Sequence, residues 1–231
     1  MKKADFIWIS IIVIISSLFV IPDTRLFLLL WTDRYPYLMG FIKTALLASM
    51  GEIMAIRIQI GNYQIDRTTW MKFFVWGMLG LLFVMTFQLF SSGVASLQDT
   101  GLLPSIEGGF NSILLKAFLT SLLMNVLFAP TFMILHRLTD QYITLGKGRL
   151  RQIKKVRLLT VLEQIDWHFF FRFVLFKTIP LFWIPAHTVT FLLPENYRVL
   201  MAAYLSIALG IILSFSKKKS RLKNNEESNH E

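Results

Sequence analysis

Long apolar runs alternate with short polar joints along this chain, and the pattern predicts helices that cross a membrane. The runs occupy residues 6–22, 37–58, 70–91, 112–135, 169–192 and 199–215. A spanning helix needs about 20 mostly apolar residues, and each run approaches or exceeds that length. Helices are expected because an open strand would leave its backbone groups unpaired in lipid. The predicted fold class is therefore all-α, a polytopic bundle of six transmembrane helices.

Lysine and arginine residues collect in alternate joints, and this asymmetry predicts the orientation of the bundle. The N-terminus, the joint after the second run, the joint after the fourth run and the C-terminal tail are basic, whereas the intervening joints contain few positive residues. Positive charge favours the cytoplasmic side, so both termini are predicted to be cytoplasmic. Residues 149–167 mix basic with apolar side chains. A loop with some helix and a helix lying on the membrane both stay open there.

Three segments are expected. Residues 1–33 form an extra N-terminal signal anchor, which is retained because no small-residue cleavage site follows the first run. Residues 34–216 form the main helix bundle, and residues 217–231 form a polar, basic, cytoplasmic tail that should be disordered. Pro180 and Pro185 interrupt the fifth run, which is either a kinked span or a re-entrant segment.

Composition narrows the class of protein further. Hydrophobic residues make up 55% of the chain and charged residues 16%, against about 25% charge in soluble domains. The net charge of +10 comes from residues at the ends of apolar runs, which suits anionic lipid headgroups. The bilayer is therefore the expected partner and nucleic acid is not, while a homo-oligomer stays open. No cysteine, paired-carboxylate or phosphate-loop motif is present, so no enzyme activity, cofactor or metal is expected.

The second run contains an acidic residue at membrane depth. A stripe of small residues, which lets another helix approach closely, comprises Thr44, Ala48, Gly51 and Ala55. Glu52 flanks this stripe, and a buried carboxylate is costly unless it is paired or hydrated. Glu52 is therefore either a pore-lining acid or one member of an ion pair between helices. Lys43 and Arg57 lie toward the two ends of the run, on the opposite side, and are expected to reach the headgroups.

Helix direction suggests a cation partner for Glu52. The second run should place Glu52 in its cytoplasmic half, and the fifth run enters from the same side with Arg172 and Lys177. Lys177 lies about 12 Å beyond residue 169 along a helix, so it is the first choice. Arg172 is shallower and can reach the headgroups.

Three further polar residues in or beside the runs are candidates for a pore lining: Asn125, His187 and Arg198. Each also has a structural interpretation. Asn125 suits a hydrogen bond between helices, His187 a bond to a neighbouring backbone group, and Arg198 a cap at the membrane edge. Gly77 and Gly80 suit close packing or a bend.

An ordered set of short motifs resembles the Mpv-seventeen family, which includes the twenty-two-kilodalton peroxisomal membrane protein. The resemblance covers roughly residues 34–216, and the first run is extra to it. The motifs are Tyr35-Pro36 before Gly51-Glu52, then Asp66-Arg67-Thr68, then Phe128-Ala129-Pro130, then Pro194 with Tyr197-Arg198, and finally Leu213-Ser214-Phe215.

The resemblance implies an integral protein of an inner or organelle membrane, with pore or small-solute channel activity suggested for some members. Glu52 keeps the acid that the family has as aspartate, but Met124-Asn125 replaces its Asp-Gln pair. A small-solute pore is therefore the leading hypothesis, in a bacterial inner membrane or alternatively an organelle membrane. A non-conducting scaffold and a lipid-acting enzyme using Glu52 and His187 are the alternatives.

Overall fold

A computed structural model describes residues 2–228, and that part of the chain is helical with no strand. The chain divides into two compact units, each treated separately below. One comprises Met1–Gly80 with Ala203–Glu231, and the other comprises Leu81–Ala202. The boundaries fall inside two long helices, α4 (Arg67–Asp99) and α11 (Glu195–Ser228).

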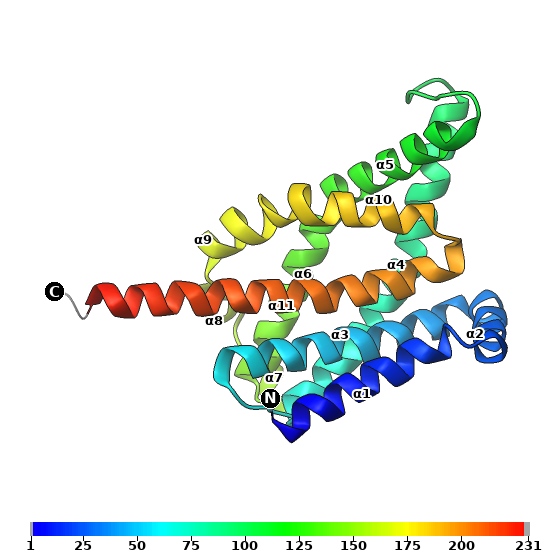
Figure 1. Ribbon diagram of the computed structural model, residues 1–231. Coiled ribbons are helices and arrows are strands. Elements are labelled where there is room, and N and C mark those ends of the chain that lie inside the picture. Colours follow the sequence, from blue (N-terminus) through cyan, green and yellow to red (C-terminus); the bar gives the residue numbers. More distant parts are fainter. Residues whose placement is uncertain (1, 229–231) are drawn as a thin grey trace. The chain divides into compact units, whose positions relative to one another are not determined.

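The first unit contains α1 (Lys3–Leu18), α2 (Pro22–Arg34), α3 (Pro36–Ile60) and parts of α4 and α11. Figure 1 shows α1 and α11 beside α3. The indole Nε1 of Trp8 donates to the carbonyl of Met50 at 3.0 Å, and Asp5 pairs with Arg57 further along α3. These two contacts make α1 antiparallel to α3. Gly61, with a φ of 81°, ends α3 in the left-handed conformation that glycine adopts without strain.

Small residues bring helices of the first unit close together, as the stripe on the second run predicts. A Cβ atom on Gly51 would lie 2.8 Å from the Cα atom of Ile207 in α11. A Cβ atom on Gly80 would collide with the carbonyl of Gly40. The close-packing interpretation of Gly77 and Gly80 is confirmed, because Gly77 abuts the ring of Phe41 in the same way.

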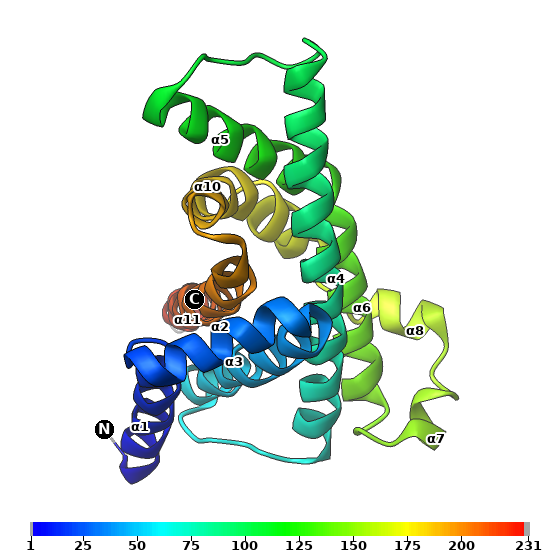
Figure 2. The ribbon, with the colours of Figure 1, turned by 90° about the vertical axis from the view of Figure 1, so that its right-hand side faces the viewer.

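The second unit contains the remainder of α4, then α5 (Gly109–Leu127), α6 (Ala129–Leu145), α7 (Leu150–Ile153) and α8 (Leu158–Glu163). A further helical segment follows as α9 (Trp167–Phe169), two π-helical stretches, η1 (Phe170–Leu175) and η2 (Ile179–Trp183), and α10 (Ile184–Leu192). α5 packs along α10 (Figure 1), and the short helices α7 and α8 lie beside α6 (Figure 2).

Among the described residues, four helical segments are long and apolar enough to cross a membrane: α3, α4, α5 and Trp167–Leu192. The bent pair α1 and α2 gives a fifth if the two helices are counted as one span. The prediction of an all-helical membrane protein is therefore supported, with four or five candidate spans among the described residues. Six spans and cytoplasmic termini stay predictions.

Several predicted boundaries are wrong. The run at 112–135 is not one helix, because α5 ends at Leu127 and a new helix begins at Ala129. Pro130 explains the break, since it has no N–H and its ring clashes with the carbonyl four residues earlier. The first joint is not a loop either: α1 ends at Leu18, and Pro22 begins α2 at an angle of 78°.

The fifth run forms one helical segment, Trp167–Leu192, of 26 residues. This continuity favours the kinked span over the re-entrant segment. Of its two π-helical stretches, the second contains Pro180, which has no N–H and therefore interrupts the regular hydrogen-bond ladder. The segment 149–167 holds only two short helices, so one continuous surface helix is wrong.

The predicted disorder after residue 215 is also wrong as far as Ser228, because α11 continues to that residue. Lysine, arginine and glutamate dominate this stretch and are good helix formers. The side chains of the basic tail, on which the predicted contact with anionic lipid depends, lie outside the described residues, as do positions 229–231.

Candidate functional site

Glu52 is one member of an ion pair between α3 and α4. Its carboxylate contacts the ammonium group of Lys72 and accepts a hydrogen bond from Nε1 of Trp76 at 3.2 Å. The exposed fractions of the Glu52 and Lys72 side chains are 21% and 14%. The charge of Glu52 is therefore balanced inside the first unit, and the structural interpretation of this acid fits the geometry.

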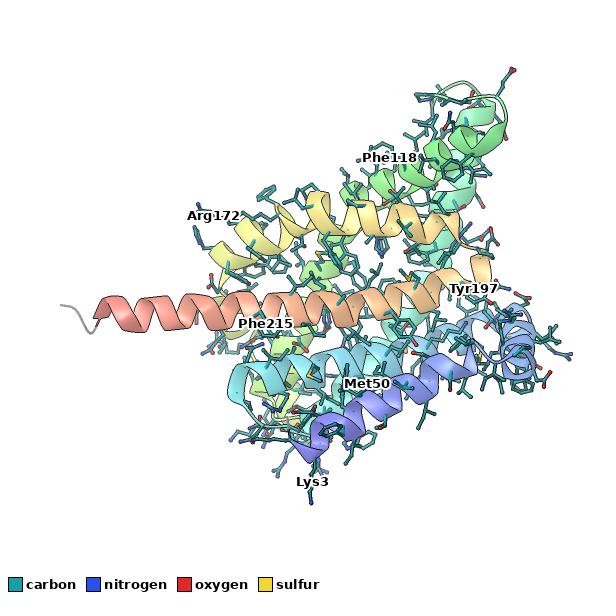
Figure 3. The ribbon with its side chains drawn as sticks, in the orientation of Figure 1. Lys3, Met50, Phe118, Arg172, Tyr197 and Phe215 are labelled. Atoms are coloured by element: carbon teal, nitrogen blue, oxygen red, sulfur yellow. The ribbon has the colours of Figure 1, made fainter. Side chains whose placement is uncertain are left out.

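The expected partner of Glu52, Lys177, is not the cation that the structure gives. Lys177 is exposed, and its ammonium group lies over the ring of Phe173, 5.7 Å from the centroid. Arg172 is exposed as well, and Figure 3 shows its side chain pointing away from the helix. The depth of Lys177 along the helix is therefore a poor guide, because its side chain lies on an outer face.

The prediction that Lys43 reaches the headgroups is also wrong. Its side chain does not reach outward, since the residue is only 4% exposed and Nζ donates to Oγ1 of Thr32 at 2.7 Å. The hydrophobic pattern did not predict a helix at Pro22–Arg34, so Thr32 could not be foreseen as the acceptor for Lys43. Arg57 binds Asp5 of α1, with Nε 3.0 Å from Oδ1. Both cations therefore hold neighbouring helices to α3.

Asn125 and His187 meet between α5 and α10 in the second unit. Nδ2 of Asn125 donates to the carbonyl of Ser121 at 2.8 Å and lies 3.1 Å from Nδ1 of His187. If Nδ1 accepts this second bond, the imidazole is neutral and carries its proton on Nε2. Asn125 is 0% exposed and His187 is 7% exposed. The expected interhelical bond of Asn125 is thus present, whereas His187 bonds to a side chain rather than to backbone.

A hydroxyl and two aromatic rings complete this polar set. The Oγ atom of Ser121 donates to the carbonyl of Ile184 at 2.7 Å, which links α5 to the first turn of α10. The ring of Trp183 stacks on His187 with centroids 5.0 Å apart, and Phe87 meets the imidazole edge-on. We call Ser121, Asn125, Trp183 and His187 the α5–α10 polar set.

The indole N–H of Trp183 is buried and has no hydrogen-bond partner among the residues that the structure describes. Trp183 is the last residue of the second π-helical stretch, four residues before His187. A buried donor without a protein acceptor is uncommon, and such a group can bond to water or to a small polar molecule. The sequence did not lead us to Ser121 or Trp183 as candidate site residues. The spacing of four residues in Ser121–Asn125 and Trp183–His187 is the signal that could have found them.

Arg198 closes the end of α10. Its Nε donates to the carbonyl of Leu193 at 3.1 Å, and the guanidinium lies over the ring of Phe191. Glu195 is 3.5 Å away from Nη1. These contacts match the cap at the membrane edge rather than a solute contact.

Asp66, within the motif that supports the family resemblance, has a local role. Its Oδ1 accepts hydrogen bonds from the backbone N–H groups of Thr68 and Thr69, at 2.9 and 3.1 Å. Asp66 thus caps the N-terminus of α4, which begins at Arg67. Hydrogen bonds from Thr68 and Thr69 hold the pKa of the Asp66 carboxyl below its usual value.

Comparison of the chain with protein-family models, with curated proteins and with solved structures gives no match. The resemblance to the Mpv-seventeen family therefore rests on the short motifs alone. Within the described residues, the structure assigns those motifs to a helix cap at Asp66, a helix break at Pro130 and an end cap at Arg198.

Proposed function

We propose that this chain is an integral membrane protein that forms or regulates a pathway for small solutes, with the α5–α10 polar set as part of its lining. The observation that carries the proposal is the orphan N–H of Trp183 next to a buried imidazole and amide. Polar residues inside spans are costly and commonly mark solute or ion paths.

The backbone of the fifth span supports the same proposal. π-helical turns occur mostly as short interruptions and are frequent at functional sites. Two of them, η1 and η2, precede α10, and η2 ends at Trp183 itself. Irregular helix at membrane depth is tolerated where protein or water covers it. A donor without an acceptor at this point suits transient occupation by water or by a small polar solute.

Solute release from proteoliposomes tests the proposal. Purified protein should release small solutes and retain larger ones. Trp183→Phe should change the rate, because it removes the orphan N–H and part of the indole while keeping an aromatic ring at this position. Lys177→Met is the matched control, since it alters an exposed side chain of the same span. Release no faster than from protein-free vesicles would contradict a pathway.

A non-conducting scaffold is the second candidate. It is favoured by the way Glu52, Lys43 and Arg57 all bind other helices of the first unit. In that case the basic tail would bind anionic lipid, with each basic residue near the surface contributing about 1 kcal/mol to the binding free energy. A tail peptide should then bind anionic vesicles better than neutral ones, and neutralising Lys217, Lys218 and Lys219 should remove the preference.

A lipid-acting enzyme has less support. The two side chains that sequence analysis named for it, Glu52 and His187, are engaged by Lys72 and Asn125 respectively. Product analysis with lipid substrates tests this alternative. A bacterial inner membrane remains our proposed location, on the basis of the basic tail and the N-terminal helix.

A further inference from the structure

Helix α2 carries large apolar side chains on its surface. Leu26, Phe27, Leu30 and Trp31 are between 41% and 60% exposed. They occupy the middle of the helix, while charged residues lie toward its two ends, with Asp23 and Arg25 at one and Asp33 and Arg34 at the other. Such a cluster on a short helix suggests a surface that meets an apolar partner.

The turn between α1 and α2 sets the direction of this helix. α1 is antiparallel to α3, which is a candidate span, through the contacts Asp5–Arg57 and Trp8–Met50. Spanning helices stand within about 40° of the bilayer normal. α2 makes an angle of 78° with α1. If α3 spans the bilayer upright with α1 alongside it, α2 at 78° to α1 lies close to the plane of the membrane.

The opposite side of α2 is fixed to α3. Lys43 Nζ donates to Thr32 Oγ1 at 2.7 Å and lies 5.8 Å from the ring centre of Phe19. Leu28 and Thr32, one turn apart, are half-buried. Because these residues share one stripe of the helix, the exposed Leu26 and Leu30 must face away from α3.

The exposed surface has the chemistry of the boundary between headgroups and acyl chains. The rings of Phe27, Trp31 and Tyr35 follow one another with centroids 5.6 and 5.3 Å apart. Tryptophan and tyrosine concentrate at that boundary. Arg34 bonds to the hydroxyl of Tyr35 at 3.1 Å. Its charged end can therefore stay with the headgroups while the stem covers apolar surface.

We propose that α2 is an interfacial helix that docks on the bilayer containing α3, with Phe27, Leu30 and Trp31 in the acyl-chain boundary. Its angle, its attachment through Lys43 and its aromatic series together fix the depth of α3 in the membrane. This surface is separate from the α5–α10 polar set, so it does not depend on solute conduction.

The cysteine-free sequence allows a direct test by site-directed spin labelling. Single cysteines at Asp23, Phe27, Leu30 and Arg34 follow the spacing i, i+4, i+7 and i+11, so all four labels share one face of α2. Collision with oxygen and with a water-soluble nickel complex reports the depth of each label in reconstituted vesicles. The matched control is a pair on α1, Phe6 and Val13, both of which are exposed.

The four labels on α2 should report nearly one depth at the boundary, with more oxygen than nickel collisions at Phe27 and Leu30. The α1 labels should differ in depth by about 10 Å, from seven residues of helix rise. A steady gradient along α2, about 16 Å over eleven residues, would show a crossing helix and overturn the proposal. Strong nickel access at all four sites, or low access to both reagents through a protein contact, would overturn it equally.

Discussion

Glu52 and Lys72 form an ion pair that joins two consecutive helices of the first unit, α3 and α4. Glu52 lies about 12 Å before the end of α3 and Lys72 about 8 Å after the start of α4, as helix rise gives. A tight connection between antiparallel helices thus brings the two charges to similar depth. Trp76, one turn beyond Lys72, adds a hydrogen bond to the same carboxylate.

Breaking this pair should destabilise the protein in detergent. We expect Glu52→Gln and Lys72→Met each to lower the free energy of unfolding by about 1–3 kcal/mol, because the remaining charge keeps only part of its solvation. The double variant should recover part of the loss. Lys177→Met is the control and should change little, since that side chain is exposed. Losses that simply add in a double-mutant cycle would contradict the pair.

Two glycines of α4 should respond in opposite directions to the same substitution. Gly80→Ala would drive a Cβ atom into the carbonyl of Gly40, and we expect a loss of about 1–3 kcal/mol. Gly93 has open space around its Cα atom, so Gly93→Ala should be neutral or stabilise by up to about 1 kcal/mol. Thermal unfolding followed by tryptophan fluorescence compares the two. Equal midpoints would contradict the close contact at Gly80.

The Asp66 cap predicts that the stability of the folded protein falls at acidic pH. The folded state holds the pKa of Asp66 below its unfolded value, so the stabilisation is present above the unfolded value, about 3.9, and is lost as the pH falls through the folded pKa. Asp66→Ala should destabilise by about 1 kcal/mol near neutral pH.

Asp66→Asn is the matched variant for this cap, because it keeps a hydrogen-bond acceptor but cannot titrate. It should retain most of the stability at neutral pH and lose less than the parent protein on acidification. An acid response identical to that of the parent would assign the effect to other carboxyl groups.

The alternation of basic and nearly base-free joints predicts that both termini are cytoplasmic. A reporter fused after Glu231 should be active only if it works in the cytoplasm. Fusions after Gly101, in a joint without positive residues, should show the reverse. Periplasmic phosphatase activity from the C-terminal fusion would contradict six spans.

The hydrophobic pattern predicted the positions of α3 and α4 well, because a run of apolar residues leaves few alternatives to a spanning helix. It could not show that α5 ends at Leu127, since the residues on both sides of Pro130 are equally apolar. It also treated Pro22–Arg34 as a loop. Charged residues at both ends of that segment interrupt the apolar pattern that predicts a helix. The helix is instead supported by packing against α3 through Thr32 and Lys43.

Candidate polar residues were found more readily than their partners. Asn125, His187 and Glu52 are conspicuous because polar groups are costly in a span. Which groups contact them depends on helix rotation and on which helices are neighbours, and one sequence does not fix either. The argument from helix direction predicted Lys177 as the partner of Glu52. The same argument is equally compatible with Lys72, which lies in the adjacent span at similar depth.

Planar-bilayer recording of the purified protein tests the account most directly. The wild-type protein should give currents or solute-dependent reversal potentials above those of protein-free bilayers. Trp183→Phe and Asn125→Leu, which alter the α5–α10 polar set, should change the conductance or its selectivity, whereas Lys177→Met should leave both unchanged. Silent bilayers with a correctly folded, correctly inserted wild-type protein would contradict the pathway and leave the scaffold as the better account.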